Sequence, residues 1–221
     1  NMKGACFQGL GQFETAVEHY EKAISINTNY YKAYYNLGGA FHELGKLNLA
    51  VKSFESALSL KADYAEAHNN IGNVFQELGQ FNNAVSSFKK AITIKPDYVA
   101  AHYSLGNAFQ QLNNIEAAII SYEKALEINP DIVKLHNNLG VIYQGIGKTN
   151  SAKEHFEDAV RIMPDFIEAH NNLGNIFEEL NHLNKAKNCY KNVLAINPDS
   201  AEGYFNIGKV LQKQKQFKSA I

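Results

Sequence analysis

The chain contains 221 residues, of which 45% are hydrophobic and 19% are charged, and its net charge is −1. This composition excludes wholesale disorder, and no apolar run approaches the roughly 18 residues that a membrane-spanning helix needs. Arg161 is the only arginine, so no basic stripe for nucleic acid is expected, and the widely separated Cys6 and Cys189 exclude a disulfide framework or a cysteine-based zinc site.

Residues 1–30 are predicted as a partial repeat, because small and aromatic positions in this segment recur every 34 residues along the chain. The glycine column is Gly4, Gly38, Gly72, Gly106, Gly140, Gly174 and Gly208. The alanine column is Ala16, Ala50, Ala84, Ala118, Ala152, Ala186 and Ala220, and the aromatic column is Tyr20, Phe54, Phe88, Tyr122, Phe156 and Tyr190. The agreement of three columns indicates a tandem array of one structural unit.

The repeat at residues 31–64 is predicted as two helices. Residues 31–44 place Ala33, Leu37, Phe41 and other apolar side chains in one arc of a helix, which is the pattern of an amphipathic helix. This helix is expected to end near Gly45, where glycine accepts the left-handed conformation. A second amphipathic helix is predicted at about residues 48–59.

The repeats at residues 65–98, 99–132, 133–166 and 167–200 follow the same plan and end in a proline column. This column is Pro96, Pro130, Pro164 and Pro198, each followed by aspartate. Proline lacks an N–H group and disfavours helix in the residue before it, so it ends the second helix of each repeat. Asp97 and its equivalents are expected to cap the next helix.

Residues 201–221 are predicted as a partial repeat in which Ile221 falls inside a second helix, just as Asn1 falls inside a first helix. One continuous array over residues 1–221 is therefore expected, as a piece of a longer protein. Because no polar capping helix follows, the exposed ends are expected to stack on each other or on another copy.

The recurring Leu-Gly pair, alanine, aromatic residue and proline at a 34-residue period resemble the tetratricopeptide repeat over the whole chain. This resemblance implies an all-α, right-handed superhelical solenoid of helix-turn-helix repeats whose first helices line a concave groove for partner segments. The segments 67–73 and 169–175, with His68-Asn69-Asn70 and His170-Asn171-Asn172, also resemble the repeats of O-linked N-acetylglucosamine transferases and related bacterial proteins.

Asparagine is unusually frequent, with 26 copies, and amides concentrate on the predicted solvent-facing arc of the first helices. The predicted partner-binding groove consists of Tyr35, Asn36, Asn69, Asn70, Asn73, Gln76, Tyr103, Asn107, Gln110, Asn137, Asn138, Gln144, Asn171, Asn172 and Asn175. An amide offers donors and an acceptor, so a ladder of amides can bond an extended peptide backbone. The alternative is that the amides bond neighbouring repeats and set the superhelical pitch, and both roles can hold together.

No metal site and no cofactor are predicted. The histidine column of His68, His102, His136 and His170 lies on or beside the buried arc, and helices in adjacent repeats are about 8–10 Å apart, too far for two of these histidines to share an ion. A packing role is therefore expected for these rings. The segment 145–149 imitates a phosphate-binding loop, but Ile142 occupies the position of its first glycine.

The sequence thus predicts a non-catalytic, cytoplasmic scaffold that binds an extended or helical segment of a protein partner. Two alternatives remain at this point. The chain could be the substrate-recognition arm of a larger enzyme such as a glycosyltransferase, or a self-assembly module.

Overall fold

The computed structural model describes residues 2–219, with side chains for residues 2–215, and this part of the chain folds entirely into helices joined by short turns. The chain divides into two compact units, the first ending at Ile128 and the second beginning at Asn129. The first unit contains α1 (Met2–Gly9), α2 (Phe13–Ile26), α3 (Tyr31–Glu43), α4 (Leu47–Leu60), α5 (Ala65–Glu77), α6 (Phe81–Ile94), α7 (Val99–Gln111) and α8 (Ile115–Ile128). The second contains α9 (Val133–Gly145), α10 (Thr149–Ile162), α11 (Ile167–Glu179), α12 (Leu183–Ile196) and α13 (Ala201–Ser219).

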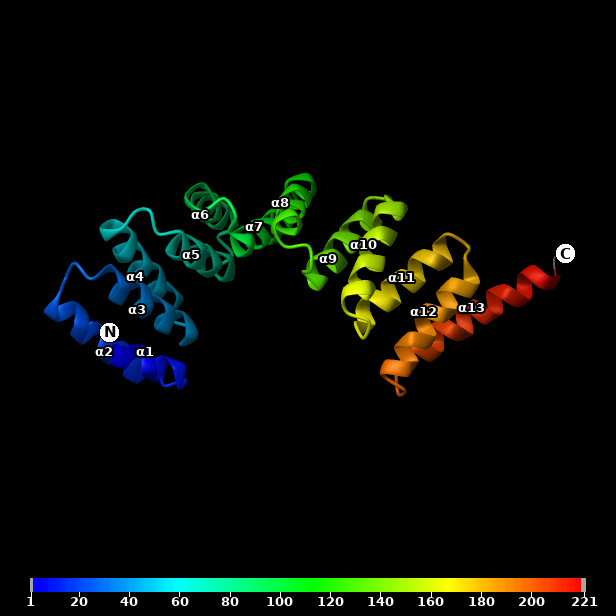
Figure 1. Cartoon of the computed structure of the whole chain (residues 1–221), viewed down its shortest axis with the longest axis horizontal. Helices are drawn as coiled ribbons and strands as arrows, with labels where there is room; N and C mark the ends of the chain where they lie inside the picture. The colour runs from blue at the N-terminus through cyan, green and yellow to red at the C-terminus, as the bar shows by residue number, and fades with distance from the viewer. Residues whose placement is uncertain (1, 220–221) are drawn as a thin grey trace. The chain divides into compact units, whose positions relative to one another are not determined.

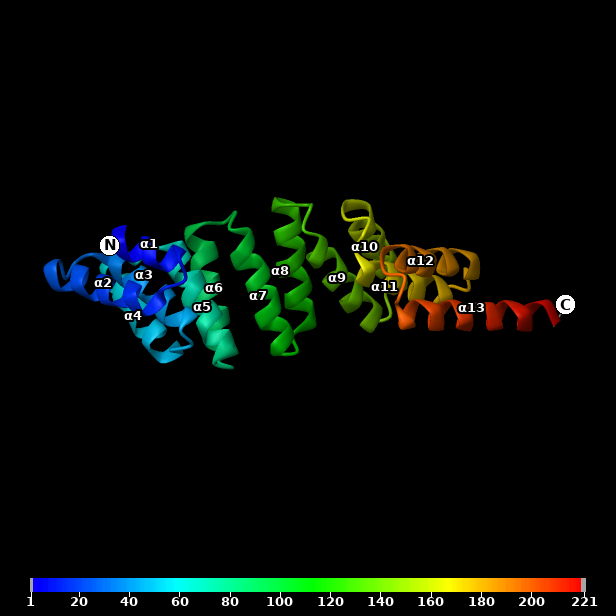
Figure 2. The same cartoon turned by 90° about the horizontal axis from the view of Figure 1, so that it is seen from below.

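Consecutive helices pair into hairpins, and each of the pairs from α3–α4 to α11–α12 lies inside one predicted 34-residue repeat. In the first unit, the first helices α3, α5 and α7 form one layer and the second helices α4, α6 and α8 form the other (Figure 1). Figure 2 shows α7 and α8 side by side. The predicted all-α helical repeat fold is confirmed. Among residues 2–219, none of the helices combines the length and apolarity needed to cross a bilayer.

The glycine and aromatic columns meet inside every hairpin. A Cβ atom on Gly106 would lie 2.4 Å from the Tyr122 ring, and one on Gly38 would lie 2.8 Å from the Phe54 ring. The aromatic rings of Tyr20, Phe54, Phe88, Tyr122, Phe156 and Tyr190 are almost completely buried, as are the alanines of the alanine column up to Ala186. Ala220 lies outside the described residues. The small residues therefore let the two helices approach until one large ring fills the space between them.

The turn inside each hairpin requires a left-handed residue. This position is held by Gly11, Gly45, Gly79, Asn113, Gly147 and Asn181, all with positive φ. Lys215 occupies the same register in the last repeat, and α13 continues through it as far as Ser219 instead of turning. Glycine has no Cβ atom and asparagine can bond its own backbone, so both tolerate the left-handed conformation, whereas lysine pays about 1–2 kcal/mol there, which disfavours the expected turn. The expected second helix at Ile221 lies outside the described residues.

The predicted aspartate caps are wrong. α7 begins at Val99 and its cap position is Tyr98, whose side chain makes no capping bond, so Asp97 lies one residue too early. Its carbonyl oxygen accepts the N–H of Val99 instead, at 3.0 Å. In two of the four linkers an asparagine before proline makes an Asx turn: Asn129 Oδ1 accepts the N–H of Asp131 at 3.1 Å, and Asn197 Oδ1 accepts that of Asp199 at 3.2 Å.

The predicted packing role of the histidine column is confirmed. In each of these four histidines, Nε2 lies 2.8–3.0 Å from the carbonyl oxygen six residues earlier. A carbonyl oxygen only accepts, so Nε2 carries the hydrogen and donates it. His102, His136 and His170 are buried and His68 is half-buried. Each ring thus fastens a first helix to the linker that precedes it.

Candidate functional site

Two neighbouring cavities lie on the first-helix layer of the first unit, and we call them together the amide groove. The first, of about 250 Å³, is lined by Gln8, Tyr35, Asn36, Gly39, His42, Glu43, Phe54, Asn70 and Asn73. The second, of about 530 Å³, is lined by His42, Asn73, Gln76, Glu77, Phe81, Ser104, Asn107 and Gln111. His42 and Asn73 line both cavities, so the groove is continuous from α3 across α5 to α7.

A hydrogen-bonded pair of side chains lies in the lining of the second cavity. His42 Nε2 on α3 lies 2.6 Å from Glu77 Oε1 on α5, and both side chains are partly exposed. Glu43 adds a second carboxylate to the lining. Among the described residues, no lysine or arginine lines either cavity. The groove therefore combines neutral amides with acidic groups.

The end of the groove near α3 is built around Tyr35. Asn70 Nδ2 donates to the Tyr35 hydroxyl at 2.9 Å, which joins α5 to α3. The Tyr35 ring packs against Tyr64 at 4.8 Å and Phe54 at 5.7 Å between ring centroids. Burial raises the pKa of Tyr35, and burial together with the neighbouring Tyr35, Glu66 and tyrosine rings raises the pKa of Tyr64 to about 12. Both phenols are neutral near pH 7, and Tyr35 forms a fixed wall of the groove.

The buried aromatic residue decides whether the amides above it are engaged inside the repeat. The Tyr122 hydroxyl lies 2.6 Å from Asn107 Oδ1 and 2.5 Å from Gln110 Oε1. The Tyr190 hydroxyl makes the equivalent contacts with Asn175 and Glu178, both at 2.8 Å. Burial raises the pKa of both tyrosines well above the usual value, so each phenol keeps its proton for these bonds.

The repeat of α5 and α6 has phenylalanine at this position, and its amides are not engaged in this way. Phe88 fills the hairpin, and it has no hydroxyl to reach Asn73 or Gln76. Within residues 2–219, no side-chain hydrogen bond holds either amide, and both are half-buried in the lining of the larger cavity. Their donors and acceptors therefore point toward the groove without a protein partner.

Three residues of the predicted groove, Asn69, Asn137 and Asn171, are not solvent-facing, which corrects the sequence analysis. Asn69, Asn137 and Asn171 are 5–8% exposed, because first helices of successive hairpins pack along this register. Asn137 Oδ1 accepts from Asn172 Nδ2 at 2.9 Å, and Asn171 Nδ2 donates to Glu202 Oε2 at 3.1 Å. Asn137 and Asn171 thus join neighbouring first helices, as the alternative interpretation predicted, whereas Asn69 Nδ2 donates to Asn70 Oδ1 on its own helix at 3.4 Å.

The remaining predicted groove residues occupy several environments. Tyr103 packs on Tyr122 with ring centroids 5.9 Å apart, and Asn138 and Gln144 are half-buried on α9 in the second unit. Of the predicted set, the amide groove brings together Tyr35, Asn36, Asn70, Asn73, Gln76 and Asn107. The prediction missed Glu77 and Gln111 as lining residues. A separation of 35 residues, as in His42 and Glu77, is the signal that could have identified contacts between first helices.

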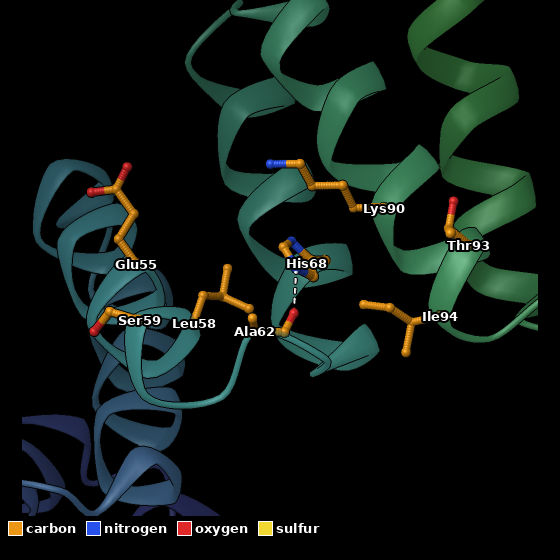
Figure 3. A pocket seen from close by; sticks show the side chains of 8 residues that line it. All are labelled: Glu55, Leu58, Ser59, Ala62, His68, Lys90, Thr93 and Ile94. Carbon is orange, nitrogen blue, oxygen red and sulfur yellow. Dashed lines mark hydrogen bonds between the residues drawn. The ribbon is translucent and has the colours of Figure 1, made fainter.

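A further cavity of about 590 Å³ lies beside the second helices α4 and α6 (Figure 3). His68 forms its floor and bonds the Ala62 carbonyl, with Leu58 and Ile94 on its walls. Burial lowers the pKa of His68, against the opposing effect of that backbone bond. A cavity of about 490 Å³ around His102 repeats the arrangement one hairpin later. This recurrence shows that the space follows from hairpin stacking.

Comparison with known families gives the same repeat. Models described as the TPR repeat match residues 9–45, 38–79, 72–113 and 174–215. Models described as the tetratricopeptide repeat match residues 99–132 and 121–154. The chain belongs to the tetratricopeptide repeat family. This fold is generally a non-catalytic protein-interaction module.

Solved structures share the fold at low sequence identity. The C-terminal part of a TPR repeat-containing protein from Cytophaga hutchinsonii aligns with a TM-score of 0.80 at 20% identity, covering 92% of this chain and 84% of that one. YrrB, described as a TPR protein with an unusual peptide-binding site, aligns with a TM-score of 0.71 at 22% identity over 86% and 97% of the two chains. MamA aligns with a TM-score of 0.69 at 25% identity over 72% and 93%. No curated protein matches the sequence significantly.

Proposed function

We propose that this chain is a non-catalytic scaffold that binds an extended segment of a protein partner in the amide groove. The observation that carries the proposal is the pair Asn73 and Gln76, which line the larger cavity without a hydrogen-bond partner among the described residues. YrrB, a structural neighbour, is described as having a peptide-binding site. Polar groups that face a cavity in this way are suited to bonding a peptide backbone.

The geometry of the repeat favours an extended partner over a helical one. Neighbouring first helices are about 8–10 Å apart, and an extended chain covers this distance in about three residues. An extended backbone also presents unpaired N–H and C=O groups at each step. A helical segment has satisfied these groups internally, so amides on the groove would find few backbone partners on it.

The charge of the groove indicates which side chains the partner carries. Glu43 and Glu77 supply negative charge, and no lysine or arginine among the described residues opposes them in the lining. We therefore expect a partner with lysine or arginine beside small or apolar residues. Each backbone bond contributes only about 1 kcal/mol net, so affinity for one short segment is expected to be modest.

A library of random peptides displayed for selection against the full chain tests the proposal. Enriched peptides are synthesised, and their affinities are measured for the wild-type protein and for Asn73→Ala/Gln76→Ala. We expect the double variant to lose at least about tenfold in affinity, since two hydrogen bonds of about 1 kcal/mol are removed. The melting temperature should remain nearly unchanged, because neither amide bonds another described residue.

The matched control is Asn48→Ala/Asn82→Ala, which removes two exposed amides from the second helices α4 and α6. It should bind the selected peptides like the wild type. Peptides that bind the groove variant and the wild type equally would place the binding surface elsewhere. A selection that enriches no peptide would argue against peptide capture altogether.

A further inference from the structure

A second cluster of functional side chains lies in the second unit, between α9 and α10. His136 on α9 faces His155 and Asp158 on α10, and one donor atom from each residue lies within 4.8 Å of the other two. We call these three residues the His–His–Asp cluster. His155 and Asp158 are three residues apart, so they share one face of α10. The cluster does not involve the amide groove, which lies in the first unit.

The hydrogen bond of His136 to its linker orients this ring as a ligand. Nε2 donates to the Pro130 carbonyl oxygen at 2.8 Å, which leaves Nδ1 with its lone pair. Nδ1 lies 3.2 Å from Nδ1 of His155. Two ring nitrogens in this arrangement are joined either by one hydrogen or by a cation bound to both. A histidine whose second nitrogen donates to a carbonyl is the usual arrangement at protein metal sites.

Asp158 adds a carboxylate that is also held in place. Arg161 bonds its Oδ1 through NH2 at 2.7 Å and through Nε at 3.3 Å. The other oxygen, Oδ2, lies 3.8 Å from Nδ1 of His136. The guanidinium group thus fixes the carboxylate with one oxygen turned toward the histidine pair. The His155 ring is positioned by Tyr143, on which it stacks at 5.4 Å with an interplanar angle of 6°.

The distances suit a tetrahedral zinc ion. Zinc binds histidine nitrogen at about 2.0–2.1 Å, so two of its ligand atoms are separated by roughly 3.3 Å. The two Nδ1 atoms are 3.2 Å apart, close to this separation. A small rotation of Asp158 would bring its oxygen from 3.8 Å to a ligand position. Two histidines and one carboxylate are a common zinc ligand set, with water completing the coordination.

The combination of the three residues departs from the repeat, although a histidine in the register of His155 does not. His19 occupies that register on α2 and stacks on Phe7 with ring centroids 5.1 Å apart, as His155 stacks on Tyr143. In the register of His155, three other hairpins carry Ser53, Ser87 and Ser121, and each hydroxyl donates to the carbonyl oxygen four residues earlier. In the register of Asp158, two of these hairpins carry Lys90 and Lys124. Only the hairpin of α9 and α10 combines a column histidine with a second histidine and an acid among the described residues.

We propose that His136, His155 and Asp158 bind a divalent transition-metal ion, with zinc as the expected ion, and that this ion links α9 to α10. Such a bond joins the first helix of one hairpin to its second helix and stabilises the second unit by ligand linkage. Cobalt should occupy the same site with the visible absorption of four-coordinate cobalt, since it accepts the same nitrogen and oxygen ligands.

The first experiment titrates zinc chloride, and separately cobalt chloride, into the tag-free full chain after chelator treatment and removal of the chelator. Calorimetry should show one site per chain, and the cobalt form should show four-coordinate absorption. His155→Ser places the residue of three other hairpins at this position, so it should fold normally. We expect it to weaken zinc binding at least about tenfold and to abolish the four-coordinate cobalt spectrum.

Two further variants separate the metal site from general effects. Asp158→Asn should also weaken zinc binding, while Arg161→Gln should weaken it less because Arg161 only positions the carboxylate. The matched control is His102→Tyr, which removes a buried histidine of the same column and installs the residue found there as Tyr34 and Tyr204. This control should bind zinc like the wild type. Circular dichroism of each metal-free variant verifies its fold.

A gain of function tests whether the three residues suffice. Ser121→His with Lys124→Asp would place the missing two ligands beside His102 in the first unit, and this variant should bind a second zinc ion. Two results would overturn the proposal: a wild-type chain without a zinc site, or equal zinc binding by the wild type and His155→Ser. The histidine pair would then be joined by a hydrogen bond alone.

Discussion

The hairpins α5–α6 and α7–α8 share one backbone plan but differ in the residue that fills them. In α7–α8 the hydroxyl of Tyr122 engages Asn107 and Gln110. In α5–α6 the ring of Phe88 has no hydroxyl, and Asn73 and Gln76 face the groove. One oxygen atom in the core therefore decides whether surface amides serve the fold or remain available to a partner.

The comparison also shows that amides at equivalent positions of different repeats have two different roles. Amides above a buried tyrosine close the hairpin from within. Amides such as Asn70, which donates to Tyr35, join one first helix to the next. Amides above a buried phenylalanine are left with unused donors and acceptors. Amides that no side chain of the same hairpin engages are thus distributed unevenly along this chain, even where the amide sequence is regular.

The largest expected effect comes from closing the space that the aromatic ring needs. Gly106→Ala places a Cβ atom 2.4 Å from the Tyr122 ring, so the ring and its hydroxyl must move away from the amides. We expect a loss of about 3 kcal/mol in the free energy of unfolding, measured by urea denaturation, which exceeds the gain of about 1 kcal/mol in helix propensity.

Gly208→Ala is the matched control for this substitution. Gly208 lies in the same column, but a Cβ atom there would have no atom of the described residues within 4 Å. This variant should be as stable as the wild type or more stable by up to about 1 kcal/mol. Equal behaviour of the two variants would show that the column does not act through contact with the aromatic ring.

The next largest loss of stability is expected from Glu178→Gln in the repeat of α11 and α12. In this repeat a carboxylate, Glu178, stands where other repeats have an amide beside the buried aromatic residue. Glu178 is buried and accepts from Tyr190, Lys209 and Lys213, the two lysine Nζ atoms lying 3.0 and 2.8 Å away. Burial by itself would raise the pKa of Glu178, but the bonds from Lys213, Lys209 and Tyr190 outweigh it and hold the pKa below its usual value. Glu178→Gln keeps a partner for the tyrosine and removes the ion pairs, at an expected cost of about 1–2 kcal/mol near pH 7.

The pH dependence of this cost has a definite sign. Because the folded state holds the pKa below the unfolded value of 4.5, the stabilisation is complete above that pH and is lost as the pH falls through the lower folded value. The difference in unfolding free energy between wild type and Glu178→Gln should therefore shrink below pH 4.5, as measured by urea denaturation from pH 7 to pH 3. A difference that stays constant over this range would mean that the carboxylate charge contributes nothing.

The features that repeat could be predicted from the sequence, and those that depart from the repeat could not. Gly106 against Tyr122 follows from two columns whose spacing places both inside one hairpin. Bonding of Asn70 to a neighbouring repeat was one of the two predicted roles, but its partner Tyr35 was not predicted, because it depends on how successive first helices pack. The position of His155 beside His136 was not predicted, because the sequence analysis compared each residue with those at the same position of other repeats. It did not compare residues on the two helices of one repeat. An alignment of the repeats therefore identifies the residues that they share, but it does not identify a cluster of side chains that occurs in one repeat.

Exchanging the two aromatic residues tests the central comparison directly. Tyr122→Phe removes a buried hydroxyl from Asn107 and Gln110 and should cost about 1 kcal/mol in the free energy of unfolding. Asn107, which lines the groove, is then released from the hairpin, so binding of the selected peptides should become stronger. Calorimetric titration of the same peptides into both proteins measures this change.

Phe88→Tyr is the reciprocal substitution, and it introduces a hydroxyl beneath Asn73 and Gln76. Its effect on stability should be smaller than about 1 kcal/mol, while its peptide affinity should fall because both amides become engaged within the hairpin. If both exchanges change affinity in the same direction, the hydroxyl does not control the availability of the amides.

The smallest expected effect concerns the bonds between first helices. Asn70→Ala leaves the half-buried Tyr35 hydroxyl without its donor, and we expect a loss of about 0.5–1 kcal/mol in the free energy of unfolding. Asn138 belongs to the same column, but no hydrogen bond of its side chain is found within residues 2–219, so Asn138→Ala should change stability by less than about 0.5 kcal/mol. Equal losses in urea denaturation would mean that the Asn70 bond adds no measurable stability. The division of roles would then rest on the buried tyrosines alone.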